Sequence, residues 1–585
     1  MVFYINMCGI FGATGKNIDV VKSLINTSSH RGPDGSSIWH NEHMTLGQNL
    51  LAITDNPATS KQPWVSDKGN VLVYNGELFN YKELCKQFSN QFRPKTNCDT
   101  ELLMWLLENK SIEEIMNNLI DSMHAFAFYI PSKHKLILSR DHAGIKPLYF
   151  YESNNNLLFG SEIKGLKKHV PCSNNIHPQS LVCMAYCGMN FLRNTMFEGI
   201  KKVNTGETLV YDLNKRNFIG SSRNIIIPKS SKKLNTEEFH EEINSAIKKT
   251  TLGIRKFGVF LSGGLDSSLL TLELRREFPD IETYTNFFTP NIIDEKANYN
   301  EDFINAKKFC EDFKIKNNPV EITPQIIANN WSETMRCMEE PRYNWNLPMY
   351  YYTNQYLSKN NTVVTFSGDM GDELLGGYEK YFHIKNNPRK PKNWEELVYL
   401  WMHRFAKPIR LNLKFDLRDL HKTLCKELPN EVWNPEDPLN SLMALDSITC
   451  VTEDFFTRND KFGMAASMEG RFPFASKKFM KYALDIHSNS KIGESINDLK
   501  LPIKSSYNNI LPKYIINKNK SGWSLPIMNW LENDNSLKSL FSETINKNDC
   551  LKNIISDVNF KFSKPKIISW MMRSWSQEYN LNFNL

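Results

Sequence analysis

The sequence predicts two domains of different fold class: an α+β sandwich, followed by an α/β domain with a doubly wound parallel sheet and a helical tail. Its 585 residues are too many for one ordinary hydrophobic core. Short β-rich runs separated by Gly and Asn turns fill the first part, whereas strands alternate with helices from residue 257 onward. We expect the first domain at residues 8–212, a linker at 213–235 and the second domain at 236–585.

The first domain contains runs of β-branched and aromatic residues that are typical of strands. The clearest runs are residues 71–74, 125–129 and 135–138. Two helical segments, near 18–29 and 99–109, interrupt these runs. The mixture favours sheets that are covered by helices.

The second domain follows a polar, basic segment that we interpret as the linker. Asn235, with Glu238 three residues later, has the pattern of a helix N-terminus. Phe239, Ile243 and Ile247 then recur at helical spacing. Further strands are expected at 257–261, 283–288 and 362–366, and mainly helices from about residue 385.

Composition excludes several classes of protein. Hydrophobic residues make up 41% of the chain and charged residues 23%, as in ordinary globular proteins. The net charge of +7 is spread along the chain, which argues against nucleic-acid binding. No apolar stretch reaches the roughly 18 residues that a membrane span needs. The 11 scattered cysteines and the lack of a signal peptide favour reduced thiols in the cytoplasm.

The most informative motif is GVFLSGGLDSS, at residues 258–268. An apolar strand runs into a Ser/Gly turn, and Ser267 and Ser268 open a helix. Glycines let the backbone approach a ligand, and the N–H groups at a helix start attract anions. The motif lacks the GxxxxGK[ST] spacing of loops that serve γ-phosphate transfer. It predicts a pyrophosphate cradle, and the plain alternative is a Ser/Gly turn without a ligand.

A second motif, SGDMGDELLGGYEKY at residues 367–381, follows another strand. It places Asp369, Asp372 and Glu373 close together, where like charges repel unless a cation is present. Ligands of open α/β sheets lie at the carboxyl ends of the strands, where both motifs fall. We therefore expect Asp266 and Asp372 to share a Mg²⁺ ion on the phosphates of ATP. The alternative is an acidic helix N-terminus that only complements the helix dipole.

A third motif, Cys8-Gly9-Ile10-Phe11-Gly12, stands near the chain start. An N-terminal cysteine has an α-amine of pKa about 7.7–8.0 that can act as general base for its own thiol. We expect either that translation starts at Met7, which is then removed, or that a short leader, MVFYINM, is cleaved. If the leader stays, Cys8 has no α-amine and glutamine hydrolysis should fail.

The second half resembles the synthetase domain of glutamine-hydrolysing asparagine synthetases, whose fold is of the ATP-pyrophosphatase, adenine nucleotide alpha hydrolase-like type. The resemblance lies in SGGLDSS, SGDMGDELLGGY, NDKFGMAASMEGRFPF (459–474) and KNKSGWSLP (518–526). It implies that Asp369 lies near the acyl-adenylate, that Tyr378 is an active-site residue and that Lys520 neutralises the pyrophosphate. The ATP-binding residues that we expect are Phe260, Ser262, Gly263, Gly264, Asp266, Ser267, Ser268, Asn286, Ser367 and Gly368.

The first half resembles the glutamine amidotransferases of the N-terminal-nucleophile hydrolase fold. The resemblance lies in CGIFG, HRGPDG (30–35), YNGELFNY (74–81), TNCDTE (96–101) and SRDHAGIKPLYF (139–150). It implies that Cys8 is the nucleophile, that Asn75 and Gly76 form the oxyanion hole and that Arg31 supports the neighbourhood of the thiol. The implied glutamine-binding residues are Leu50, Asn75, Gly76, Glu77 and Asp99. Taken singly, Asn75-Gly76 is typical of a turn and Asp99 of a helix cap.

This chain departs from the family pattern at several positions, among them Asn344 and Asn346, which replace an Asp and a Ser. Leu50 aligns with the arginine that clamps the α-carboxylate of glutamine, so glutamine binding should weaken. Met370 replaces a glycine beside the carboxylates, and Ala143 and His124 replace aromatic residues.

The resemblance implies a cytoplasmic, homodimeric ligase of asparagine biosynthesis that converts ATP, aspartate, glutamine and water to asparagine, glutamate, AMP and pyrophosphate. A β-aspartyl-AMP intermediate and ammonia transfer between the domains are implied with it. The acceptor segment is expected at residues 339–348, where Arg342 either binds a carboxylate or is simply exposed. Two alternatives stay open: a relative that uses another carboxylate or free ammonia, and a catalytically silent regulator.

Overall fold

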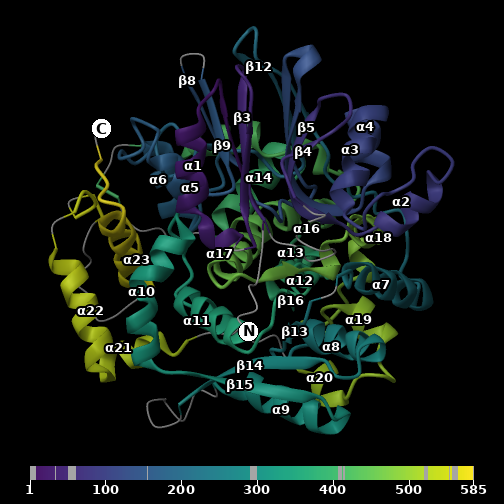
Figure 1. The fold of residues 1–585 in the computed structure, drawn as a ribbon. Helices are drawn as coiled ribbons and strands as arrows, with labels where there is room; N and C mark the ends of the chain where they lie inside the picture. The colour runs from purple at the N-terminus through teal and green to yellow at the C-terminus, as the bar shows by residue number, and fades with distance from the viewer. Residues whose placement is uncertain are drawn as a thin grey trace.

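The computed structural model places the two domains one above the other (Figure 1). It describes residues 8–32, 34–50, 61–153, 156–253, 255–289, 299–405, 411–412, 415–518, 525–547, 549–552, 554–555 and 564–583. The purple and blue first domain lies at the top of the view, and the teal to yellow second domain lies below it. Within the described residues, no helix is both long and apolar enough to span a membrane.

The first domain is built on two six-stranded antiparallel sheets. The first sheet contains β10 (Lys201–Lys202), β8 (Tyr149–Ser153), β9 (Asn156–Gly160), β1 (Gly9–Thr14), β3 (Met44–Asn49) and β2 (Ser36–His40), in that order. The second sheet contains β12 (Asn217–Arg223), β11 (Glu207–Asp212), β7 (Lys135–Arg140), β6 (Ser122–Ile130), β5 (Val71–Leu78) and β4 (Trp64–Val65). The three strands expected from the sequence are β5, β6 and β7, neighbours in the second sheet.

The two sheets face each other across one apolar core, as a sandwich requires. Ile10 and Leu46 from the first sheet and Val73, Ala127 and Leu138 from the second lie in this core, and all five are inaccessible to solvent. The helices and helical turns of this domain are α1 (Ile18–Thr27), η1 (Ser29–Arg31), α2 (Tyr81–Gln87), α3 (Asp99–Asn109), α4 (Ile112–Glu114), η2 (Ile115–Leu119), η3 (Pro131–Lys133), α5 (Ile163–Lys167) and α6 (Pro178–Cys187). Both expected helices, α1 and α3, are present.

The second domain is built on a parallel sheet whose order creates a crevice. The order is β15 (Lys316–Ile322), β14 (Glu282–Phe288), β13 (Phe257–Phe260), β16 (Val364–Phe366) and β17 (Glu469–Arg471). The chain runs from β13 outward to β15 and then returns to the other side of β13 with β16. The boundary between β13 and β16 is thus a topological switch point, where ligands of open sheets bind.

Helices surround this sheet and form most of the rest of the described second domain. They are α7 (Thr236–Thr250), α8 (Leu265–Glu277), α9 (Glu301–Phe313), α10 (Pro324–Met338), α11 (Leu347–Lys359), α12 (Gly371–Leu375), α13 (Glu379–Asn386), α14 (Trp394–His403), α15 (Leu417–Glu427), η5 (Asn430–Val432), α16 (Pro438–Ile448), η6 (Val451–Phe456), α17 (Thr457–Ala465), η7 (Pro473–Ala475), α18 (Lys477–Asp485), η8 (Ser488–Ser490), α19 (Leu501–Ser506), α20 (Lys513–Ile516), α21 (Ile527–Asn533), α22 (Asn535–Asn546) and α23 (Lys564–Glu578). The Asn235 side chain accepts hydrogen bonds from Glu237 N and Glu238 N and so caps α7 as expected.

The segment expected to be a linker, residues 213–235, differs from the prediction in its first half. Residues Asn217–Arg223 form β12, which pairs with β11 along the edge of the second sheet. The sequence did not predict this strand because its exposed side chains are mostly polar. An edge strand needs little apolar surface. Only the residues between β12 and α7 connect the two domains.

Buried ion pairs join the two domains where α17 meets the first domain. Arg31 donates two parallel hydrogen bonds to Asp460, at 2.8 and 3.1 Å, and a third to Glu162 at 3.1 Å. All three side chains are at most 3% exposed. At the next position of α17, Lys461 pairs with Glu339. A bidentate guanidinium–carboxylate pair fixes orientation as well as distance, so α17 is held in one register against the first domain.

Helix α23 packs against the same interface between the two domains. In α23, the indole of Trp570 stacks on Trp331 of α10, with 3.7 Å between the ring centroids. Trp575 donates a hydrogen bond of 2.6 Å to Glu339 O and meets Phe197 of the first domain edge to face. The yellow helix α23 accordingly lies beside α10 and below α6 in Figure 1.

Asp460→Asn should destabilise the protein by about 3 kcal/mol, because the substitution leaves the buried guanidinium of Arg31 with less than its full counter-charge. Urea unfolding of both proteins, followed by circular dichroism, measures the difference. Glu42→Gln is the matched control, since Glu42 forms an exposed pair with Lys16 that contributes about 0–1 kcal/mol. An unchanged midpoint for Asp460→Asn would contradict the role given to this pair.

Candidate active sites

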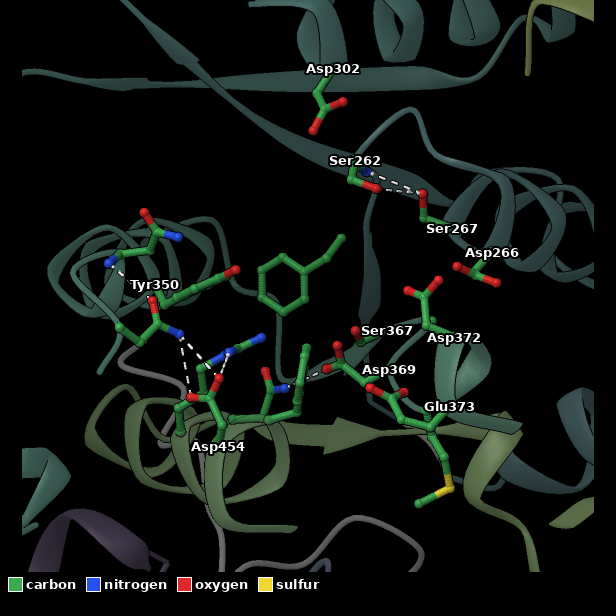
Figure 2. A pocket seen from close by; sticks show the side chains of 18 of the residues that line it. Ser262, Asp266, Ser267, Asp302, Tyr350, Ser367, Asp369, Asp372, Glu373 and Asp454 are labelled. Carbon is green, nitrogen blue, oxygen red and sulfur yellow. Dashed lines mark hydrogen bonds and ion pairs between the residues drawn. The ribbon is translucent and has the colours of Figure 1, made fainter. Parts of the chain in front are cut away.

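A cavity of about 330 Å³ lies at the carboxyl ends of β13 and β16, and we call it the main cavity (Figure 2). Both sequence motifs reach it. The first turn contributes Ser262, Asp266 and Ser267, and the second contributes Ser367, Asp369 and Asp372 among others. The two motifs therefore converge on one space at the switch point of the sheet, as the sequence predicts.

The first turn is shaped to bring its backbone close to a ligand. Ser262 and Ser267 hold it closed, with 3.0 Å between their hydroxyl oxygens. Gly263 has φ +66°, and a Cβ there would lie 2.5 Å from Asp302 O. Only glycine fits this conformation and this contact. The N–H groups that follow open α8 and favour an anion at the helix N-terminus.

Not every expected ATP-binding residue reaches the main cavity. Phe260, Ser262, Asp266, Ser267, Ser367 and Gly368 line it. Gly264 lines an adjoining cavity of about 250 Å³, which shares Asp266 with the first. Ser268 and Asn286 are buried and line neither cavity, and Asn286 instead accepts a hydrogen bond from Thr353 at 3.0 Å. The structure thus places these two expected residues in the core of the domain and not at a cavity wall.

Asp266 and Asp372 face one another, as expected for two carboxylates that share a cation. The Lys500 ammonium pairs with both of them, at 2.6 Å from Asp372 Oδ1. Oxygen donors that converge on one positive charge fit Mg²⁺, which binds one or two carboxylates and completes its shell with phosphate and water. Among the described residues, no cluster of three or more His, Cys, Asp or Glu side chains suited to a metal exists.

Lys500 is a site residue that the sequence did not reveal. It precedes α19, far along the chain from both turns, and its backbone has φ +56°. No motif that we could name contains it. Only the fold brings it to Asp266, because its neighbour Leu501 donates a hydrogen bond to Lys491 O and so positions the loop. A left-handed conformation at a non-glycine residue is uncommon and marks a constrained position.

Asp369, the expected catalytic carboxylate, lies between the two ends of the main cavity in Figure 2. The Asn459 amide of α17 donates a 2.6 Å hydrogen bond to its Oδ2. Burial raises the pKa of Asp369, while the nearby Arg458 guanidinium opposes the rise. Asn459 is a second site residue that sequence reasoning left without a role.

Tyr378 also lines the main cavity, and its hydroxyl donates a 2.7 Å hydrogen bond to Glu373. Burial, and then the neighbouring Asp372 carboxylate, raises the pKa of Glu373 to about 7. Tyr378 thus holds a carboxyl group that can carry a proton near neutral pH.

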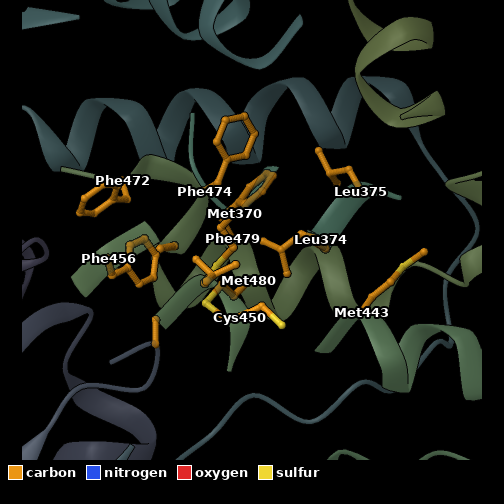
Figure 3. Close-up of a cluster of buried hydrophobic side chains, with 14 of the residues drawn as sticks. Met370, Leu374, Leu375, Met443, Cys450, Phe456, Phe472, Phe474, Phe479 and Met480 are labelled. Carbon is orange, nitrogen blue, oxygen red and sulfur yellow. The ribbon is translucent and has the colours of Figure 1, made fainter. Parts of the chain in front are cut away.

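Met370 stands where the resembling family has glycine, and the structure shows how the larger residue is accommodated. Its φ is +79°, in the left-handed region that side chains rarely adopt. Its side chain is 1% exposed and packs into an apolar cluster with Leu374, Phe472 and Phe474 (Figure 3). Burial of the thioether chain offsets the backbone strain.

The expected acceptor segment, residues 339–348, is only partly at the cavity. Asn344 and Asn346 line it. Glu339 accepts hydrogen bonds from Ile163 N and Lys164 N of the first domain, so it fastens the interface.

The structure contradicts both interpretations of Arg342, as a residue that binds a substrate carboxylate and as an exposed residue. It is 1% exposed, so it is not a surface arginine, and it does not line the main cavity. Its guanidinium donates hydrogen bonds to Glu453 O at 2.6 Å and Pro341 O at 3.1 Å. Backbone acceptors from two segments occupy it, which makes it a structural residue.

A second site, which we call the thiol site, surrounds Cys8 at the start of β1. The Gln48 amide lies 3.4 Å from Cys8 Sγ and 3.3 Å from Tyr74 O, which brings the thiol beside β5. Arg31 Nε donates to Cys8 O at 3.4 Å, in keeping with the supporting role expected for it. Gln48 had no assigned role in the sequence. Residues 1–7 lie outside the described residues, so the free α-amine stays a prediction.

Asn75 and Gly76 follow Tyr74 directly on β5. The Asn75 side chain is 2% exposed, and its Nδ2 has no hydrogen-bond partner within the described part of the chain. A buried amide donor without an acceptor is costly unless a ligand supplies one. A Cβ on Gly76 would lie 2.2 Å from Met123 O, so this position admits only glycine. Both features fit an oxyanion hole.

Glu77 and Asp99 are buried beside the thiol site, where the resemblance places glutamine. One Asp99 oxygen accepts from Leu78 N at 2.9 Å and from the Tyr74 hydroxyl at 3.2 Å. Burial raises the pKa of Asp99 to about 6, and burial followed by the Asp99 charge raises the pKa of Glu77 well above its usual range. Arg471 of β17 lies 3.6 Å from Glu77 and offsets part of this repulsion.

Leu50 and Lys520 are the two remaining site residues expected from the sequence. Leu50 is buried, and its N–H binds Gly35 O, but residues 51–60 beside it lie outside the described residues. Lys520 lies outside them as well. Lys518, two positions earlier, pairs with Asp302 at the edge of both cavities.

Comparison with known proteins agrees with this division of the chain. Residues 7–220 match the glutamine amidotransferase domain, and residues 238–582 match the asparagine synthase domain. Asparagine synthetase [glutamine-hydrolyzing] 1 of Bacillus subtilis is 24% identical over 577 residues, which cover 90% of this chain and 88% of that protein. Asparagine synthetase [glutamine-hydrolyzing] 3 of the same organism is 24% identical and covers 96% and 95%. A putative asparagine synthetase [glutamine-hydrolyzing] 2 of Methanocaldococcus jannaschii is 28% identical and covers 64% and 76%.

A glutamine amidotransferase domain with a thiol site is thus joined to an asparagine synthase domain, an α/β domain with an acidic cavity. The chain belongs to the asparagine synthase family.

Lys500→Met should make thermal stability depend on Mg²⁺. Without the ammonium, Asp266 and Asp372 repel one another, at a cost of about 3 kcal/mol, and the divalent ion can replace the lost charge. Thermal unfolding with and without millimolar Mg²⁺ measures this. Lys504→Met is the control, since Lys504 lines only the adjoining cavity and binds Asn497 O. Equal Mg²⁺ shifts in both variants would contradict the shared-cation site.

Proposed function

We propose that this chain is a glutamine-dependent asparagine synthetase, a ligase that converts ATP, aspartate, glutamine and water to asparagine, glutamate, AMP and pyrophosphate. The observation that carries the proposal is the convergence of the Ser/Gly turn and the acidic turn on one cavity at the sheet switch point. Membership of the asparagine synthase family supports it. The names of the Bacillus subtilis relatives support glutamine as the nitrogen donor.

In the second domain, a β-carboxylate oxygen of aspartate attacks the α-phosphorus of ATP, and the bond to the bridging oxygen breaks to release pyrophosphate. Ser262, Ser267 and the N–H groups of their turn bind phosphate oxygens. Asp266 and Asp372 would hold Mg²⁺, which neutralises phosphate charge. Lys500 adds positive charge at the same edge of the cavity.

In the first domain, the Cys8 thiolate attacks the carboxamide carbon of glutamine. Asn75 Nδ2 and the N–H of Gly76 stabilise the oxyanion, a contribution of about 3 kcal/mol per donor. Ammonia leaves, and water then hydrolyses the thioester to glutamate and restores the thiol. Ammonia finally attacks the β-aspartyl carbonyl in the second domain, and AMP leaves.

The domain folds that fit these roles are an N-terminal-nucleophile hydrolase sandwich and an adenine nucleotide alpha hydrolase-like sheet. The two six-stranded antiparallel sheets and the five-stranded parallel sheet support this assignment. We further propose that the enzyme is cytoplasmic and homodimeric, by analogy with the family.

A second candidate function is amide synthesis from free ammonia. Leu50 favours it, because an apolar side chain there cannot bind the α-carboxylate of glutamine as an arginine would. Pyrophosphate release with aspartate, measured with glutamine or with ammonium, separates the two candidates. Release with both nitrogen sources supports the first, release with ammonium alone supports the second, and release with neither excludes both.

Asp266→Asn should abolish aspartate-dependent pyrophosphate release while glutamine hydrolysis continues at its normal rate. The substitution removes a metal-binding charge from the main cavity and leaves the thiol site intact. Parallel assays of pyrophosphate and glutamate measure the two activities. Equal loss of both would be incompatible with separate sites.

Cys8→Ala should lose at least about 10³-fold in glutamine hydrolysis, since the nucleophile is absent, yet keep ammonium-dependent asparagine formation. Quantifying asparagine with each nitrogen source tests this. Failure with ammonium would mean that Cys8 is needed for the structure of the enzyme rather than for its chemistry.

A further inference from the structure

Asp369 occupies the middle of the main cavity, between Asp372 and Asp454 (Figure 2). Asp372 pairs with Lys500 at 2.6 Å. Asp454 pairs with Arg458 at 3.0 Å. Within the described residues, no cationic side chain lies within ion-pair distance of Asp369. A carboxylate outside an ion pair keeps more of its basicity than one that a cation holds.

The hydrogen-bond partner of Asp369 is a neutral amide instead. Asn459 Nδ2 donates to Asp369 Oδ2 at 2.6 Å, which anchors one of the two carboxylate oxygens. Asn459 lines the main cavity from the first turn of α17. Both of its neighbours in sequence, Arg458 and Asp460, form ion pairs with residues of other segments. A turn of helix that is held on both sides therefore presents the amide to Asp369.

This anchor matters because a carboxyl group turns easily about its last side-chain torsion. Asp369 also has negatively charged neighbours, which would push an unanchored carboxylate out of place. Burial raises the pKa of Asp369, and a hydrogen bond to the charged form opposes that rise. With Oδ2 held by Asn459, Oδ1 is left for a reacting group in the cavity.

We propose that Asn459 is a positioning residue for amide formation, which anchors Asp369 so that Asp369 Oδ1 faces the nitrogen that attacks the acyl-adenylate. The inference rests on the proposed function and concerns the second of the two steps in the main cavity. Ammonia forms a C–N bond to the acyl carbon, and its nitrogen becomes positively charged. An N–H bond then breaks and the proton goes to Asp369 Oδ1. The C–O bond to AMP breaks last, and the proton passes from Asp369 to water.

The first step makes no such demand. In adenylation the attacking group is already a carboxylate, so no proton has to be removed from it. Loss of the anchor should therefore slow amide formation and leave adenylation nearly unchanged. A residue that only supports the shape of the cavity would affect both steps alike.

Asn459→Leu tests this difference, because leucine has a similar shape and no donor. Amide formation with saturating ammonium, followed by rapid quench in a single turnover, should slow about 10- to 100-fold, as expected for one hydrogen bond to a charged group. Exchange of labelled pyrophosphate into ATP, which needs aspartate but no ammonia, should change little. Equal losses in the two reactions would overturn the inference.

Asn459→Asp separates positioning from packing. Aspartate is isosteric with asparagine, so a role in packing alone predicts normal amide formation. Positioning predicts a loss at least as large as in Asn459→Leu, because a second carboxylate beside Asp369 repels it or shares its proton. Normal amide formation in Asn459→Asp would contradict the inference. Should Asn459→Leu fail to fold, this isosteric variant still decides.

A double-mutant cycle links the effect to Asp369. Asp369→Asn lacks the proton acceptor, so adding Asn459→Leu to it should cause no further loss of amide formation. A further loss as large as in the unaltered background would show that Asn459 acts through another group, and the inference would be wrong.

Asn354→Leu is the matched control. Asn354 is a buried residue of α11 that lines neither cavity, and its amide donates to Tyr350 O at 2.8 Å. Any loss that this variant causes should be equal in pyrophosphate exchange and in amide formation.

Failure of the proposed function gives a different result. If the unaltered protein exchanges pyrophosphate with another acid and not with aspartate, asparagine synthesis is refuted. The comparison of the two steps in Asn459→Leu, made with that acid, then decides the inference. If no acid supports exchange, both the proposed function and the inference are wrong.

Discussion

The bidentate pair between Arg31 and Asp460 is the contact on which the arrangement of both sites depends. Arg31 lies beside the backbone of Cys8, and Asp460 lies one residue after Asn459, which binds Asp369. In a single turn of α17, one side chain therefore binds Arg31 beside the thiol site, and the side chain before it lines the main cavity. The pair is bidentate and buried. Neither domain can therefore rotate against the other without breaking charged hydrogen bonds that water cannot replace.

Local sequence was sufficient where backbone chemistry decides the structure. The turn after β13 could be predicted because Gly263 needs a left-handed conformation and serines follow at a helix start. The start of α7 could be predicted in the same way, because Asn235 has a side chain that caps a helix. Strands with one buried face could be predicted from their runs of β-branched and aromatic residues. Two strands could not: β12 is an exposed edge strand, and β17 has only three residues, all buried, so neither shows an alternation of apolar and polar side chains.

Contacts made over long sequence separations could not be predicted. Lys500 lies 234 positions from Asp266, and nothing around it distinguishes it from a surface lysine. Arg342 and Arg458 show the same limit, since both stand among acidic and aromatic residues, and only the fold directs one to backbone carbonyls and the other to the cavity. Charged side chains acquire roles from what packs around them, and that depends on the whole chain.

The apolar core that contains Met370 continues across the domain boundary, and this continuity limits how the protein can be dissected. Phe79, Met123 and Val182 of the first domain belong to the same buried cluster as Phe239 and Phe474 of the second. Cutting the chain in the connection before α7 would expose a broad apolar surface on each fragment, and such surfaces drive aggregation. The glutamine amidotransferase half and the asparagine synthase half are therefore poor candidates for separate expression, and co-expression of both fragments is the practical route to a split enzyme.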